Sequence, residues 1–181
     1  MKALVLVFLI LVCYSNGDSV EDHYWRDFKG LIPNDAIPYI STDEPAYLGQ
    51  FSVVAEYNSD IANIHTLVAT ISSGSQRAVA AYNGRTVYSN ETSNFKILCS
   101  SNSRYRYSWN TRKVTYSPNC RYVVGGNEDN VPLFIGRTTK GKETVAGKIF
   151  SDASFHSGKL TVPYQGGQEE FDTYEILTYC Y

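Results

Sequence analysis

Short apolar runs separated by polar turns recur along most of the chain. Turns rich in glycine and asparagine follow one another closely, at Asn83-Gly84, 125–127, 140–142, 157–159 and Gly166-Gly167. Runs such as 132–136 and 159–162 lie between turns, which is typical of antiparallel strands in a sandwich or a barrel. The nearest candidate for a helix is 61–71, but its β-branched residues are equally consistent with a pair of strands. We therefore predict an all-β fold.

The first residues follow a different pattern, in which a basic start leads into an unbroken apolar run. Lys2 precedes the apolar residues 3–12, and small or polar residues follow up to Gly17. This arrangement predicts a secretory signal peptide at 1–17, cleaved after Gly17, in preference to a buried N-terminal strand or helix. So short a run cannot span a bilayer, which requires about 20 apolar residues. We expect a secreted, extracellular protein with no membrane span.

The remaining chain contains motifs that recur in the same order in its two halves. AYLGQ (46–50), AAYNG (80–84) and FKIL (95–98) are echoed by LFIGR (133–137), VPYQG (162–166) and YEIL (174–177). A duplication followed by changes in loop length produces such an ordered set of matches. We predict two β-rich repeats, at 18–100 and 101–181, packed as one unit, because each half alone would bury only a small core.

Composition and charge exclude several classes of function. The formal net charge is −2 and the basic residues form no single run, so no nucleic-acid partner is expected. The chain has no GxSxG, HExxH or P-loop motif. Gly125-Gly126 is not followed by a helix-forming stretch, as a dinucleotide-binding loop would require. We expect neither an enzyme nor a cofactor.

Three cysteines follow the predicted signal peptide: Cys99, Cys120 and Cys180. In an oxidising compartment they predict one disulfide and one remaining thiol, with the pairing left open. The remaining thiol could pair with a second chain, which would give a homodimer. The sequence has no paired CxxC or HxxxH spacing, so we expect no metal site. Asn90 begins the sequon Asn-Glu-Thr in a polar stretch and is a candidate for N-glycosylation.

The second half of the chain resembles the DM9 repeat. The motifs that carry the resemblance are YSW (107–109), Gly125-Gly126, PLFIGR (132–137), AGKIF (146–150) and VPYQGGQEEFDTYEIL (162–177). The first half keeps YW (24–25), GLIPNDAI (30–37), AYLGQ and FKIL. The resemblance implies two tandem antiparallel β-rich repeats that form one pseudo-symmetric unit, the first of them degenerate.

The same resemblance implies a function, because some DM9 proteins resemble lectins that bind mannose and microbial glycans. Their site takes an acidic residue from the glycine-rich turn and a lysine from the later Gly-Lys turn. Here the lysine is Lys148, and the acidic position falls on Asn127, with Glu128 and Asp129 beside it. A carboxylate that accepts from vicinal hydroxyls and a lysine that donates suit a sugar. We expect a glycan-binding protein of innate immunity.

Each candidate residue also has a structural interpretation. Lys148 could be a solvated turn lysine, and 127–129 an ordinary polar turn. We interpret Arg137 as an ion-pair partner, and the aromatic residues at 24–25 and 107–109 as core anchors. The histidines share no spacing, so no catalytic or metal-binding histidine is expected. The alternative function is a secreted, non-catalytic structural or interaction module whose sugar site has decayed.

Overall fold

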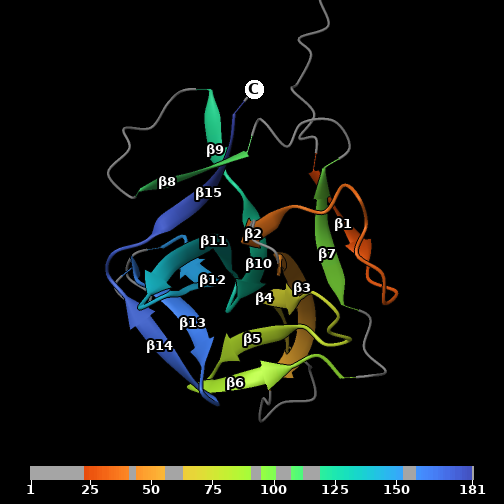
Figure 1. Ribbon diagram of the computed structural model, residues 1–181. Helices are drawn as coiled ribbons and strands as arrows, with labels where there is room; N and C mark the ends of the chain where they lie inside the picture. The colour runs from red at the N-terminus through yellow and green to blue at the C-terminus, as the bar shows by residue number, and fades with distance from the viewer. Residues whose placement is uncertain are drawn as a thin grey trace, which may run out of the picture.

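The chain folds into a single continuous antiparallel sheet (Figure 1). The computed structural model describes residues 23–40, 44–55, 63–90, 95–100, 107–111, 119–152 and 158–180. Within these ranges it forms fifteen strands and no α-helix. The predicted all-β fold is therefore confirmed. The predicted signal peptide at 1–17 lies outside the described residues.

Seven strands come from the first half of the chain and eight from the second. The first seven are β1 His23–Asp27, β2 Pro38–Ile40, β3 Ala46–Ala55, β4 Asn63–Ser72, β5 Val79–Tyr82, β6 Arg85–Tyr88 and β7 Lys96–Ser100. The others are β8 Tyr107–Thr111, β9 Cys120–Tyr122, β10 Val124–Glu128, β11 Val131–Lys140, β12 Glu143–Phe150, β13 Leu160–Tyr164, β14 Gly167–Phe171 and β15 Glu175–Cys180.

Strand β4 settles the ambiguous segment at 61–71. Most of that segment forms one extended strand, in which the side chains of His65, Leu67, Ala69 and Ile71 are buried at every second position. This period of two is that of a strand, whose successive side chains point to opposite faces. The β-branched residues that weakened the helix interpretation therefore favour the observed conformation.

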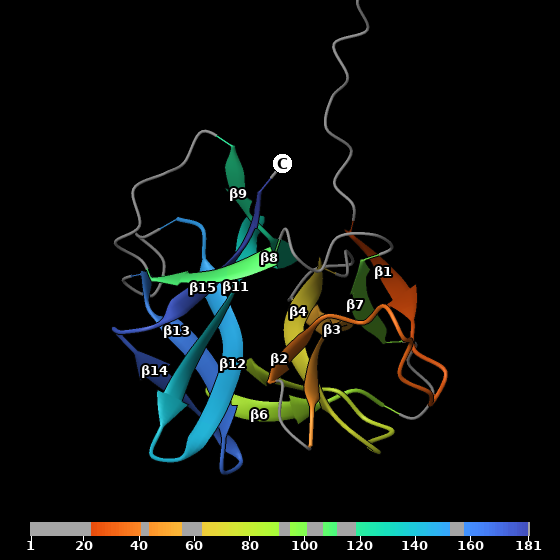
Figure 2. The same cartoon turned by 45° about the horizontal axis from the view of Figure 1, so that its top comes forward.

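The order of strands in the sheet is symmetric about its middle. It runs β1-β7-β3-β4-β5-β6 and continues as β14-β13-β12-β11-β15-β8. Strand β10 pairs with both β11 and β4, so the eight strands from β4 through β6 and β14 to β11 and β10 close into a ring. Figure 2 shows the two halves as neighbouring lobes, with β6 crossing between them. Each half thus contributes the same arrangement of strands.

The register of the strands shows the same correspondence at the level of single residues. Gly49 of β3 lies opposite Ile97 of β7, and Gly136 of β11 lies opposite Ile176 of β15. The β2–β3 and β10–β11 pairings each contain a register shift. The motifs AYLGQ and LFIGR therefore occupy equivalent places in the two halves, as do FKIL and YEIL. The boundary between repeats at residue 100 remains a prediction.

The largest buried cluster draws on both halves. It includes Leu48, Val68 and Leu98 from the first half and Leu133, Ile135, Leu177 and Tyr179 from the second. Trp25, Tyr107 and Trp109 pack against this cluster, as predicted for core anchors, whereas Tyr24 is exposed and hydrogen-bonds to Asp35. Burial of each large aliphatic side chain contributes about 1.5–3 kcal/mol. This shared core makes the two halves one unit.

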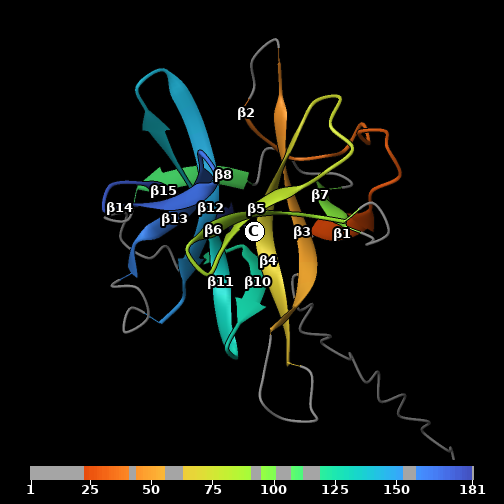
Figure 3. The ribbon, with the colours of Figure 1, turned by 90° about the horizontal axis from the view of Figure 1, so that it is seen from below.

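Two contacts between strands join the halves of the sheet. Strand β6 meets β14, where the hydroxyl of Thr86 donates to the carbonyl of Gly167 at 2.6 Å. Strand β4 meets β10, where Asn127 lies opposite Thr66, and Figure 3 shows these two strands side by side. A Cβ on Gly126 would lie 2.1 Å from the carbonyl oxygen of Thr66. Only glycine permits so close an approach of the two backbones.

The disulfide links Cys120 and Cys180, which lie directly opposite each other on β9 and β15. Cys99, the remaining candidate, is fully buried in the core of the first half. A disulfide to a second chain through Cys99 would require this part of the core to open. Asn90 is exposed, and the rest of its sequon lies outside the described residues. No helix in the described part of the chain is long and apolar enough to cross a membrane.

Candidate functional site

The turn predicted at 125–129 lies further along the chain, because residues 125–128 belong to β10 and only Asp129 and Asn130 form the tight turn that leads into β11. Asp129 and Asn130 both have positive φ, at 50° and 62°, as a type I′ turn requires. Aspartate and asparagine tolerate this left-handed conformation better than most residues. Glu128 ends β10, and Asn127 lies one residue earlier, opposite Thr66 of β4. The hairpin therefore places all three predicted residues where the second half meets the first.

Lys148 and Glu128 form a buried ion pair. The Lys148 Nζ lies 2.5 Å from Oε1 and 2.7 Å from Oε2 of Glu128. The two residues are only 4% and 5% exposed. Burial lowers the pKa of the Lys148 ammonium, and the negative charge of Glu128 opposes that shift. The structure thus brings two of the predicted residues together, but the charge of each is already paired with the charge of the other.

Aromatic rings from both halves surround this ion pair. The Lys148 Nζ lies 5.8 Å from the ring centroid of Tyr82 and 5.4 Å from that of Phe150. Burial raises the pKa of the Tyr82 phenol, and the charge of Glu128 adds to the increase. Tyr82 therefore keeps its hydroxyl proton at neutral pH. The pair is enclosed at the junction of the halves, since Tyr82 belongs to the first and Lys148 to the second.

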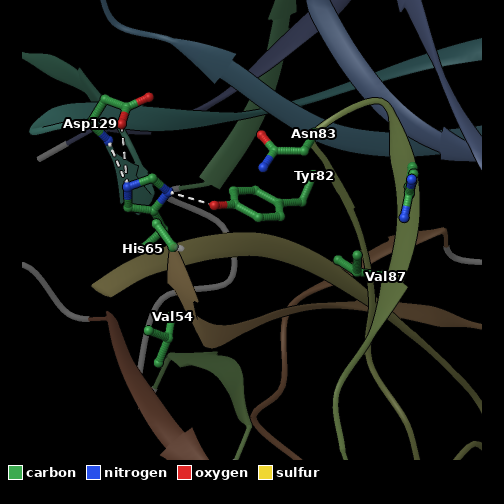
Figure 4. Close-up of a pocket in the computed structure, with 8 residues that line it drawn as sticks. Val54, His65, Tyr82, Asn83, Val87 and Asp129 are labelled. Atoms are coloured by element: carbon green, nitrogen blue, oxygen red, sulfur yellow. Dashed lines mark hydrogen bonds and ion pairs between the residues drawn. The ribbon is translucent and has the colours of Figure 1, made fainter. Parts of the chain in front are cut away.

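His65 connects the junction to the acidic turn (Figure 4). Its Nε2 accepts from the backbone N–H of Asp129 at 3.4 Å and lies 3.3 Å from the Asp129 carboxylate. Its Nδ1 lies 3.2 Å from the hydroxyl of Tyr82. When Nε2 accepts, Nδ1 carries the proton and donates to Tyr82. The hydroxyl hydrogen of Tyr82 is then left for another acceptor.

These side chains line a cavity of about 690 Å³, which we call the inter-half cavity. Its polar lining residues are His65, Tyr82, Asn83, Arg85 and Asp129, and its apolar lining residues are Val54, Ala55 and Val87. Figure 4 shows Asp129, His65 and Tyr82 joined in a row, with Asn83 beside the tyrosine. The volume lies within the range of about 300–1,000 Å³ that small-molecule sites occupy.

The inter-half cavity offers hydrogen-bonding groups of both kinds beside an apolar surface. The side chain of Asp129 is 60% exposed and accepts hydrogen bonds, whereas Tyr82 and Asn83 can donate. Val54 and Val87 supply carbon surface to the same cavity. This combination fits a ligand that carries several hydroxyls on an apolar ring.

The sequence-based prediction missed His65, Tyr82 and Asn83. We expected no catalytic or metal-binding histidine and gave His65 no other role, and we interpreted Asn83-Gly84 only as a turn. Positive φ at Asn83 (48°) and Gly84 (77°) does make it a tight hairpin turn, which holds Tyr82 and Asn83 at the cavity. Only the pairing of β4 with β10 brings His65 to Asp129, and no local pattern in the sequence signals that contact.

The lysine position has no equivalent cation in the first half. Gly49 lies opposite Ala69 in the first half, as Gly136 lies opposite Gly147 in the second. The residue that follows Ala69, and therefore matches Lys148, is Thr70. This register agrees with the absence of a lysine from 68–73 in the sequence.

Tyr82 has an equivalent in the second half, Tyr164, and a lysine side chain covers the ring of that residue. Tyr82 lies opposite Arg85 in the β5–β6 hairpin, as Tyr164 lies opposite Gly167 in the β13–β14 hairpin. The Lys140 Nζ sits 3.3 Å from the ring centroid of Tyr164 and pairs with Glu169. A cation of the chain itself thus occupies the face of Tyr164.

Arg137 acts as a structural ion-pair partner, as predicted. It pairs with Glu175 at 2.8 Å, donates to the carbonyl of Tyr39 at 2.8 Å, and lies over the ring of Trp109. Glu169 and Glu170 pair with Lys140 and Lys159. Among the described residues, no group of three or more His, Cys, Asp or Glu side chains could hold a metal ion.

Comparisons with known proteins place these features in context. The DM9 repeat family matches residues 59–159, a range that includes His65, Tyr82, Asp129 and Lys148. No curated protein matches the chain. Among solved structures, the nematode sperm cell motility protein MFP2B is similar, with a TM-score of 0.55 at 10% identity. The alignment covers 89% of this chain and 45% of that one, so this chain spans less than half its length. At this identity the likeness concerns the fold alone.

Proposed function

Because the chain belongs to the DM9 repeat family, we propose that it is a secreted, non-enzymatic protein that binds mannose-type glycans in the inter-half cavity. The observation that carries the proposal is the row formed by Asp129, His65 and Tyr82 along the wall of that cavity. The likeness of DM9 proteins to lectins of microbial recognition supports a role in innate immunity.

The proposed roles follow from exposure and hydrogen-bonding capacity. Asp129 accepts hydrogen bonds from two neighbouring sugar hydroxyls, since its carboxylate is largely exposed. Tyr82 donates to a ring or hydroxyl oxygen. His65 fixes the orientation of the Tyr82 hydroxyl, and it holds the turn in place through the backbone N–H of Asp129. Glu128 and Lys148 lie beneath and hold the wall in place rather than contact the sugar, because they are buried and bonded to each other.

Three features of the chain support secretion. The basic and apolar start at 1–12 is typical of a signal peptide. The disulfide between Cys120 and Cys180 suits an oxidising compartment. Asn90 is exposed, as a glycosylation acceptor must be.

A glycan array probed with the chain lacking its predicted signal peptide tests this function, and we expect signal on mannose-type glycans. The variant Asp129→Asn should bind roughly ten- to hundredfold more weakly, because a hydrogen bond to a charged group contributes about 1.5–3 kcal/mol. Asparagine tolerates the positive φ of the turn, so the fold should persist. The matched control Asp172→Asn makes the same change at an exposed residue that does not line the cavity. No signal on any glycan would exclude the proposed function.

The alternative is a secreted structural or interaction module without sugar binding. The buried ion pair of Lys148 and Glu128 favours this alternative, because the ammonium of Lys148 is not accessible to a ligand. The burial of Cys99 gives no support to a disulfide-linked homodimer as the basis of such a module. A silent glycan array combined with an intact fold is the result that this alternative predicts.

A further inference from the structure

Among the described residues that line the inter-half cavity, one cationic side chain has no ion-pair partner in the described part of the chain. The charge of Lys148 is paired with Glu128, and Lys140 is paired with Glu169. Arg85 lines the cavity and is exposed. Its side chain forms no ion pair or hydrogen bond with any of the described residues. An anionic group that entered the cavity would therefore meet an available guanidinium.

The backbone of Arg85 is held in a fixed place. It begins β6 directly after the turn at Asn83-Gly84, and the N–H of Gly84 donates to Gln168 at 3.1 Å. The next residue, Thr86, is bonded through its N–H to the carbonyl of Gly166 at 3.0 Å. Arg85 also lies directly opposite Tyr82, and cross-strand partners present their side chains on the same face. The backbone of Arg85 is therefore fixed opposite the tyrosine that lines the cavity, and its side chain lies on the same face of the hairpin.

The fold itself does not require an arginine at this position. In the second half the equivalent residue of the β13–β14 hairpin, opposite Tyr164, is Gly167. That hairpin forms without a side chain there. The β5–β6 hairpin therefore does not need the side chain of Arg85, and that side chain places an exposed positive charge at the cavity.

We propose that the inter-half cavity binds mannose-type glycans that carry an acidic substituent, with the acid on Arg85 and sugar hydroxyls on Asp129. The inference rests on the proposed function. A guanidinium recognises a carboxylate, sulfate or phosphate through two parallel hydrogen bonds. Asp129 repels an anion but accepts from hydroxyls, so the two charges orient the ligand in one direction. The volume of about 690 Å³ leaves room for a substituted ring.

Binding to matched oligosaccharides by titration calorimetry tests this inference. The probes are a neutral mannose oligosaccharide, the same oligosaccharide with a phosphate or a sulfate, and one of equal length with a uronic acid. We expect at least tenfold tighter binding of one or more acidic probes than of the neutral one. The arm that binds most tightly identifies the acidic group. In Arg85→Gln this preference should disappear, whereas Arg121→Gln, an exposed arginine on β9, should retain it.

The outcomes separate this inference from the function on which it rests. Equal binding of neutral and acidic probes by the unmodified chain would overturn the inference and leave glycan binding standing. A preference that survives in Arg85→Gln would also overturn it. If no probe of either kind binds, the proposed function fails and the inference fails with it. Circular dichroism of both variants shows whether the sheet is intact.

Discussion

Replacing Lys148 with methionine is expected to lower the free energy of unfolding by about 3–5 kcal/mol, because the substitution leaves the buried carboxylate of Glu128 without a partner. The two side chains are almost fully buried and joined by two hydrogen bonds, at 2.5 and 2.7 Å. Water cannot take the place of the ammonium without entering the junction between the halves. Urea denaturation followed by tryptophan fluorescence measures the loss.

The matched double variant separates the cost of an unpaired charge from the cost of lost packing. Glu128→Leu combined with Lys148→Met removes both charges and keeps apolar volume in the site. We expect it to recover most of the stability lost in Lys148→Met, because apolar replacements of buried ion pairs are often neutral or stabilising. An equal loss of unfolding free energy in the single and double variants would contradict this explanation, because an unpaired charge would then not be the cause of the loss.

This expectation changes how a binding experiment on Lys148 must be interpreted. A sequence-based design would mutate Lys148 to test for direct contact with a sugar. In the structure such a variant also removes the partner of Glu128 and weakens the wall that holds Asp129 and His65. Loss of binding in a Lys148 variant would therefore not demonstrate contact, whereas Asp129 is exposed and can be changed alone.

Removing the disulfide with Cys120→Ser and Cys180→Ser is expected to cost about 4 kcal/mol, as estimated from the chain entropy of a loop of this length. The two cysteines are separated by 60 residues and fix β9 against the last strand. We expect a lower denaturation midpoint for the double variant, and a similar decrease when the unmodified chain is reduced. Addition of reductant should not change the midpoint of the double variant. A decrease of less than about 1 kcal/mol in the free energy of unfolding would contradict this stabilising role of the disulfide.

Much of the sheet could be predicted from the sequence, because its turns and its echoes are local signals. The glycine- and asparagine-rich turns at 83–84, 140–142 and 166–167 do separate strands. The echo of AYLGQ in LFIGR corresponds to equivalent positions of Gly49 and Gly136 in the register. Such features depend on residues near one another in the chain, which sequence patterns report well.

The cavity could be predicted only in part, because it depends on contacts between distant strands. The turn containing Asp129 was found from the family resemblance. His65 is 64 residues away and reaches it only because β4 pairs with β10 across the halves. The burial of Lys148 was also hidden, since a lysine after glycine is usually an exposed turn residue. Lys148 is buried because its ammonium pairs with Glu128 and lies near the rings of Tyr82 and Phe150.

The most direct test of glycan binding in the inter-half cavity is an NMR titration of the nitrogen-15-labelled chain with a mannose oligosaccharide. We expect the largest amide shifts at Tyr82, Asn83 and Asp129. Little change is expected at Lys140, which covers the equivalent tyrosine of the second half, or at its partner Glu169. Saturable shifts confined to Lys140, Glu169 and their neighbours would contradict the proposed site, as would the absence of any shift at saturating glycan.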